Sequence, residues 1–183
     1  AALFEQLPFV LKVSVTGRLW IISTHVVISL TWAVTAGLLV FVQFGQAGRA
    51  FPTQVVVAEL SKFLNDVVII PCASLSLLSG LVLCAITPWG YFKHWWVVIK
   101  GLLTVSLIFF GSAALGPWLD SNAALVAGLN LPEIPADSIY WTTLFQGLVG
   151  GGVQVLLQLA VVFISFLKPW GRTPWKRPIN AQV

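Results

Sequence analysis

Four apolar stretches, each long enough to cross a lipid bilayer, constrain this chain more than any other feature. They run over about residues 19–44, 67–86, 95–115 and 139–167, and Lys100 is the only Lys, Arg, Asp or Glu within them. A transmembrane helix needs about 20 consecutive, mostly apolar residues, so each stretch predicts one crossing. The sequence therefore predicts an all-α, polytopic membrane protein folded as a four-transmembrane-helix bundle.

Composition and length leave little room for anything besides this bundle. Of the 183 residues, 58% are apolar and 9% are charged, whereas about a quarter of the residues in a soluble domain are charged. We expect an interfacial N-terminal segment over residues 1–17, the bundle over residues 18–168, and a basic, Trp-rich tail over residues 169–183. The positive charges cluster beside the apolar stretches, which indicates topology and lipid contact, and we expect no nucleic-acid partner.

Basic residues flank the apolar stretches unevenly, and this asymmetry predicts the orientation. Lys and Arg are enriched in the cytoplasmic segments of membrane proteins, so we expect both termini to be cytoplasmic. The segment 116–138 has acidic but no basic residues and is expected to be a loop on the opposite side, while Pro52 indicates a helical extension before the second stretch. The predicted cytoplasmic side carries Lys12, Arg18, Lys93, Lys168, Arg172, Lys176 and Arg177, and the other side carries Arg49 and Lys62.

The turn between the second and third stretches, TPWGYFKHWW, combines helix-breaking residues with aromatic and basic ones. Pro88 and Gly90 favour a tight reversal of the chain, and Trp rings favour the headgroup level of a bilayer. The motif PWG of this turn recurs at residues 169–171, after the fourth stretch. The tryptophans that we expect to act as interface anchors are Trp89, Trp95, Trp96, Trp118, Trp170 and Trp175.

Small and polar residues recur every four positions on three of the stretches, which is typical of faces where helices pack closely in lipid. The Gln residues of the fourth stretch are expected to form interhelical hydrogen bonds, with binding of a quinone headgroup or another polar ligand as the alternative. The two cysteines are interpreted as small packing residues. The predicted packing positions are Ser29, Ala33, Gly37, Cys72, Ser76, Gly80, Cys84, Gln146, Gly150, Gln154 and Gln158.

His25 and Lys100 are the ionisable residues expected at depth in the bilayer. His25 follows Arg18 by seven residues, or about 10 Å of helix at about 1.5 Å per residue, and Lys100 follows Lys93 by the same spacing. A buried His either forms a structural hydrogen bond or acts as an axial ligand for haem iron or another metal. Lys100 either extends to the surface along its own helix or pairs with an anionic group such as a haem propionate. His94, at the boundary, is a second ligand only if its helix lies deeper.

Three motifs follow one another within about residues 18–107: RLWIISTHVVISLTW, TPWG and YFKHWWVVIKGLLTV, of which the turn is the specific part. This order resembles an uncharacterised group of bacterial four-helix integral membrane proteins. In that group a His-containing first helix is followed by a turn of the form PWG, aromatic, basic, His, then WV and Lys. The resemblance implies the four-helix architecture and a bacterial inner membrane. The matching positions are His25, Pro88, Trp89, Gly90, Phe92, Lys93, His94, Trp96 and Lys100.

The sequence contains no CxxCH for covalent haem, no HExxH, no Gly-rich phosphate loop and no Ser nucleophile elbow. We therefore predict a non-catalytic integral membrane subunit or accessory protein of a larger complex, which packs against partner subunits, or copies of itself, and against lipid. The alternative is a membrane protein that binds b-type haem or another tetrapyrrole for electron transfer or sensing. In that case His25 is the axial ligand and Lys100 lies beside a propionate.

Overall fold

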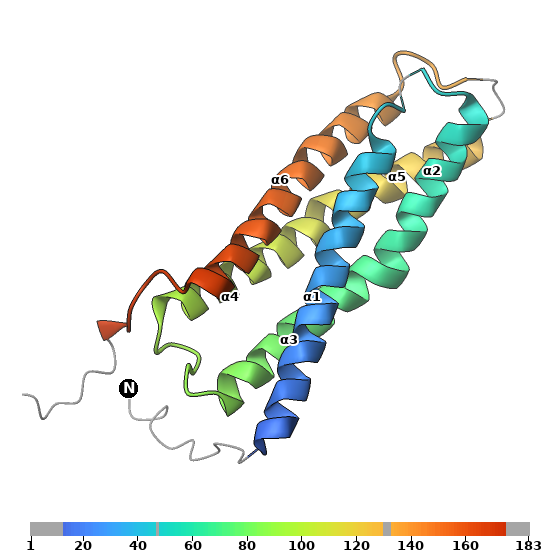
Figure 1. Ribbon diagram of the computed structural model, residues 1–183. Coiled ribbons are helices and arrows are strands. Elements are labelled where there is room, and N and C mark those ends of the chain that lie inside the picture. The colour runs from blue at the N-terminus through green and yellow to red at the C-terminus, as the bar shows by residue number, and fades with distance from the viewer. Residues whose placement is uncertain (1–12, 47, 130–132, 175–183) are drawn as a thin grey trace, which may run out of the picture.

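Four long antiparallel helices form the bundle in this computed structural model, which describes residues 13–46, 48–129 and 133–174 (Figure 1). All four helices are long and apolar enough to span a bilayer, which confirms the predicted fold class. The second comprises α2, η2 and α3, and the third comprises α4, η3 and α5, where η2 and η3 are π-helical. In chain order the segments are α1 (Val15–Gln43), α2 (Phe51–Leu64), η2 (Asn65–Ile69), α3 (Ile70–Ile86), α4 (Trp95–Phe110), η3 (Gly111–Leu115), α5 (Gly116–Gly128) and α6 (Ile139–Leu167).

The second and third helices are longer than the apolar stretches from which they were predicted. They contain 36 and 34 residues, or about 50 Å of helix, against a hydrocarbon core about 30 Å thick. The predicted loop over residues 116–138 is wrong in its first half, because α5 continues the third helix to Gly128. Asn122, Ala123 and Val126 share one face of α5 and are buried, and this face packs against α2 and α6.

Each π-helical segment ends two residues before a proline. Pro71 and Pro117 occupy the first turns of α3 and α5, after η2 and η3. A proline inside an α-helix clashes with the carbonyl group one turn earlier. The wider turn of a π-helix relieves this clash, so the second and third helices continue through their prolines.

The helices pack tightly at one end of the bundle and separate toward the other. α1 packs against both α3 and α6, and α2 packs against α5, which also contacts α6. Figure 1 shows α1 and α3 diverging from α4 and α6 toward the end where residues 13 and 174 lie. The helix axes are therefore closer together at one end of the bundle than at the other.

The two ends also differ in charge. The end where residues 13 and 174 lie, here called the basic end, carries Arg18, Lys93, Lys168 and Arg172. The other end, here called the acidic end, carries Glu59, Asp66, Asp120, Glu133 and Asp137. There Lys62 forms ion pairs with Asp66, at 2.9 Å, and with Asp120, which tie the second helix to the third. The described ends of the chain thus share the basic end, and its cytoplasmic location stays a prediction.

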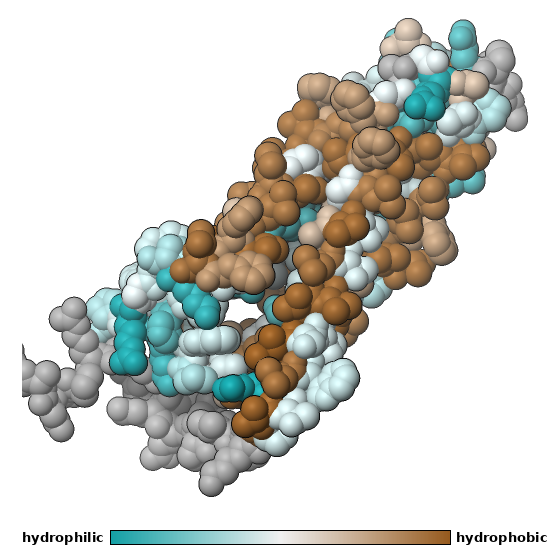
Figure 2. Space-filling model, viewed as in Figure 1, coloured by the Kyte–Doolittle hydropathy of each residue, from teal (hydrophilic) through white to brown (hydrophobic). Residues whose placement is uncertain are grey.

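The exterior of the bundle is apolar along most of its length, while many interior side chains are polar. Figure 2 shows apolar residues covering the visible sides of the helices. Phe41, Phe109 and Phe166 are 76%, 73% and 80% exposed, whereas Gln154 and Gln158 are 4% and 5% exposed. This distribution is the one expected for a bundle surrounded by lipid, where hydrogen bonds and close packing hold the helices together.

The orientation can be tested by labelling single cysteines in intact cells. In a variant without Cys72 and Cys84, we expect Asp137→Cys, exposed at the acidic end, to react with a membrane-impermeant maleimide. Lys93→Cys, exposed at the basic end, should react only after the cells are permeabilised. The opposite labelling pattern would show that the basic end faces outward.

Candidate functional site

A layer of polar side chains near the basic end receives one residue from each of four helices. On one side, His25 of α1 lies with Nδ1 2.8 Å from the Oγ atom of Ser79 of α3. On the other, Lys100 of α4 donates from Nζ to the Oγ atom of Ser165 of α6, also at 2.8 Å. We call these four residues the lysine–histidine layer.

The hydrogen bond to Ser79 favours one tautomer of His25. The Ser79 hydroxyl group is placed to donate to backbone carbonyls of its own helix, that of Leu75 at 2.6 Å and that of Ser76 at 3.2 Å. With its hydrogen used in this way, its oxygen accepts, and the tautomer that fits carries the proton on Nδ1 of His25. In the neutral imidazole this leaves a lone pair on Nε2, which is the atom available to bind a proton or a metal.

Packing around His25 relies on small residues of α3, as the predicted stripe of small residues requires. A Cβ atom added to Gly80 would lie 3.4 Å from Cε1 of His25, so the ring rests directly over this glycine. One turn deeper, the Oγ atoms of Ser29 and Ser76 lie 2.7 Å apart, and Ser29 also donates to the carbonyl group of His25. These contacts bring α1 and α3 together at the depth of the histidine.

Lys100 reaches the neighbouring helix α6 instead of extending along its own helix to the surface. Ser165 donates to the carbonyl group of Val161, so its oxygen accepts from the Lys100 ammonium group. In the described part of the chain, ion pairs form only at Lys62, near the acidic end. Within the described residues, the Lys100 ammonium group is thus held by a neutral hydroxyl group.

His94 lies outside the lysine–histidine layer, at the N-terminal cap of α4. Its Nδ1 donates to the carbonyl group of Trp89 at 3.1 Å. The backbone beside it pairs with the tail of the chain, where Trp95 N donates to Gly171 O and Thr173 N donates to Lys93 O. The structure therefore does not bring His94 together with His25 as a second ligand.

The two PWG motifs meet at the basic end, because the tail packs onto the turn. Trp89 of the first motif packs edge-to-face on Trp96, with 5.4 Å between ring centroids. Nζ of Lys168, which directly precedes the second motif, lies 4.8 Å from the centroid of Trp89 and 6.0 Å from that of Trp96. Cation–π contacts of this kind favour Trp over other rings. The recurrence of PWG thus marks two segments in contact.

The other tryptophans predicted as interface anchors are distributed over both ends. Trp95 and Trp170 are exposed at the basic end. Trp118, in α5, packs edge-to-face on Phe110 with 6.3 Å between ring centroids. Trp175 lies outside the residues that the structure describes.

The predicted glutamine face of α6 is only partly buried. Gln154 and Gln158 point into the bundle, whereas Gln146 is exposed. The interhelical hydrogen bonds predicted for the buried glutamines are not formed within the described residues at Oε1 of Gln154 or at either amide atom of Gln158. Residues four apart drift by about 40° around a helix, so three such steps carry Gln146 well away from Gln158. Gly150 packs closely on the third helix, where an added Cβ would lie 3.1 Å from side-chain atoms of both Phe110 and Leu115.

Because of the same drift, the predicted packing faces of α1 and α3 are also only partly buried. Ser29 lies inside the bundle, Ala33 is half-buried, and Gly37 has nothing within 4 Å of an added Cβ. On α3, Cys72 and Cys84 are half-buried thiols. Cys72 packs beside the buried cluster of Trp32, Ala73 and Leu107.

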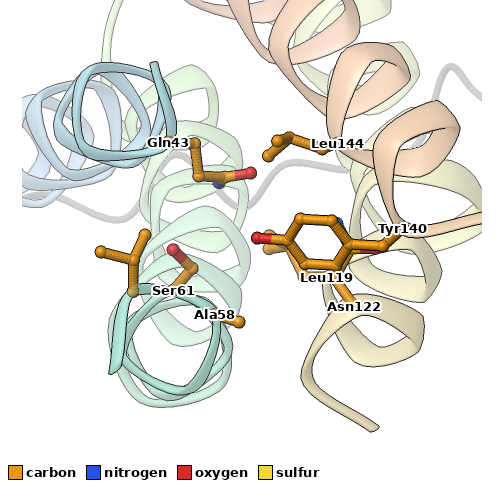
Figure 3. A pocket seen from close by; sticks show the side chains of 8 residues that line it. Gln43, Ala58, Ser61, Leu119, Asn122, Tyr140 and Leu144 are labelled. Atoms are coloured by element: carbon orange, nitrogen blue, oxygen red, sulfur yellow. The ribbon is translucent and has the colours of Figure 1, made fainter. Parts of the chain in front are cut away.

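A second polar cluster, at the acidic end, was not predicted. Gln43, Ser61, Asn122 and Tyr140 line a cavity of about 10 Å³, which is room for about one water molecule. Figure 3 shows the Tyr140 hydroxyl group pointing toward Gln43 and Ser61. Asn122 also accepts a hydrogen bond from Thr143 of α6. In the sequence, the polar residues Gln54, Ser61 and Asn65 recur at helical spacing, which indicates a polar helix face. This pattern does not indicate which residues of the other helices contact that face.

Within the described residues, no group of three or more His, Cys, Asp or Glu side chains could hold a metal ion. No protein-family model, curated protein or solved structure matches this chain. The residues of the bundle are therefore the evidence on its function.

Proposed function

We propose that this protein is a non-catalytic integral membrane subunit that packs against a helix of a partner subunit, with a bacterial inner membrane as its location. The observation that supports this most directly is a pair of glycines beside the contact of α1 and α6. An added Cβ at either Gly37 or Gly152 would meet nothing within 4 Å. Glycine destabilises a helix by about 1 kcal/mol relative to alanine, and close approach of a second helix is the use that membrane proteins make of it.

The two glycines flank the place where α1 and α6 touch. A Cβ added at Gly151 would lie 2.9 Å from Cγ2 of Val40, so the two backbones already approach closely there. Gly152 follows Gly151 and lies about 160° around the helix from the buried Gln154. It therefore lies on the outer side of the contact.

Gly37 lies on the same outer side of α1. It precedes Val40 by three residues, or about 60° around the helix, and follows the buried Ala36 by about 100°. We name Gly37 and Gly152 the outer glycine pair. A partner helix that crosses α1 and α6 here would bury both glycines at once.

Bulky substitutions of the outer glycine pair test this proposal. We expect Gly37→Leu and Gly152→Leu each to reduce the partner recovered by detergent pull-down from native membranes about tenfold, which corresponds to about 1.4 kcal/mol. Gly101→Leu is the matched control, because Gly101 of α4 is exposed and also has nothing within 4 Å.

Recovery of the wild-type protein as a monomer without partners would contradict the proposal, as would equal losses in all three variants. Recovery of a second copy of this chain as the partner would identify a homo-oligomer.

A second candidate function, binding of b-type haem or another tetrapyrrole, is supported by the state of His25. Metal-ligating histidines characteristically donate the other ring N–H to an acceptor, which holds the ring and its tautomer. Ser79 accepts from Nδ1 in this way, and Nε2 keeps its lone pair. Lys100, in the same layer, could neutralise a propionate.

An absorption spectrum of the purified protein, oxidised and then reduced with dithionite, tests the tetrapyrrole function. After expression with ample haem, this function predicts a Soret band that His25→Ala removes and His94→Ala retains, because His94 lies outside the layer. A wild-type protein without a Soret band would exclude haem, and a band that survives His25→Ala would show that another residue is the ligand.

A further inference from the structure

We propose that Lys100 binds the phosphate group of an anionic phospholipid, which reaches the lysine–histidine layer from the leaflet at the basic end, between α1 and α6. This site is separate from the outer glycine pair. Three features of the bundle support it: an unbalanced positive charge, an opening toward lipid, and unused hydrogen-bond donors.

The charge at this end of the bundle calls for an anion. Lys100 lies inside the helical bundle, and a charged side chain in the membrane interior is costly unless it is paired. Arg18, Lys93, Lys168 and Arg172 surround this end, and in the described part of the chain Asp and Glu lie at the other end. A balancing negative charge would therefore come from outside the described residues, and a lipid headgroup can bring it.

The bundle is open at the depth of Lys100. α1 and α6 touch near Val40 and Gly151, and again near Gln43 and Gly147, in the half toward the acidic end. From there the two helices separate toward the basic end, and Figure 2 shows a hollow between them. A headgroup can therefore approach sideways from the surrounding lipid, without passing between packed helices.

The donors of the layer match a phosphate oxygen. A lysine ammonium group has three N–H donors, and within the described residues the single hydrogen bond of Lys100 goes to Ser165. The remaining donors can bind one or two oxygen atoms. Lys168, the C-cap residue of α6, adds positive potential at the basic end, where anionic lipids are attracted over about a Debye length.

The helix surfaces on either side of the hollow suit acyl chains. Trp20 at the start of α1 is 71% exposed, and Phe163 and Phe166 near the end of α6 are 63% and 80% exposed. An amphiphile can thus place its tails on these apolar side chains while its phosphate group reaches Lys100. A soluble phosphate ion would lack this apolar contact, so we assign the site to a lipid.

Native mass spectrometry of the purified full-length protein can test this inference, with phosphatidylglycerol and phosphatidylcholine as competing probes. We expect the wild type to retain phosphatidylglycerol in preference to phosphatidylcholine. Lys100→Met should weaken this retention about tenfold, or about 1.4 kcal/mol, because it keeps the length of the side chain but removes its charge. Lys93→Met is the matched control, since Lys93 is an exposed lysine near the same end, and should retain the lipid.

Lys100→Arg keeps the positive charge and should retain phosphatidylglycerol, so it separates loss of charge from loss of folding. Equal retention of the two lipids by the wild type would overturn the inference without any variant. Equal effects of Lys100→Met and Lys93→Met would also overturn it, and displacement of the phospholipid by palmitate or haem would show that the site prefers a carboxylate. None of these results depends on Gly37 or Gly152, so the partner-subunit proposal is tested separately.

Discussion

Hydrogen bonds and close contacts between polar and small side chains hold these four helices together. A lipid environment offers little hydrophobic drive for one apolar helix to join another, so packing and interhelical hydrogen bonds must do so. The bonds of His25 with Ser79, Ser29 with Ser76, and Lys100 with Ser165 join helices at matching depths. Because the four helices are antiparallel neighbours, each such bond also determines how far one helix is displaced along another. The polar interior is therefore the source of the register of the bundle.

The same constraint accounts for the difference between the two ends. At the acidic end, α2 and α5 add a second layer of contacts, with Val126, Tyr140 and Leu144 in an apolar cluster beside the polar cavity. At the basic end, two hydrogen-bonded pairs face each other across a wider interior, and backbone hydrogen bonds join the turn to the tail. Binding of a ligand is easier to accommodate where the helices already separate. Both the phospholipid inference and the tetrapyrrole candidate therefore concern the basic end.

Sequence reasoning could predict the four long apolar helices, because hydropathy follows position along the chain. Counting from Arg18 and Lys93 predicted similar depths for His25 and Lys100, and the structure shows each of them hydrogen-bonded to a serine of a neighbouring helix. A four-residue periodicity ignores the rotation of about 40° that accumulates at each step along a helix. Gln146 was therefore grouped with Gln154 and Gln158 although it is exposed. The polar cluster of the acidic end needs residues from four separate helices, and the π-helices depend on local hydrogen bonding. Neither is visible in a hydropathy pattern.

A disulfide bond between α1 and α3 measures the register of the interior most directly. In a variant without Cys72 and Cys84, Ser29→Cys combined with Ser76→Cys should cross-link rapidly under mild oxidation, because the two Oγ atoms lie 2.7 Å apart. Disulfides require Cβ atoms about 4 Å apart, and Ser74 of α3 is exposed, so the control pair Ser29→Cys with Ser74→Cys should stay reduced. Failure of the first pair to cross-link, or equal cross-linking of both pairs, would contradict the register described here.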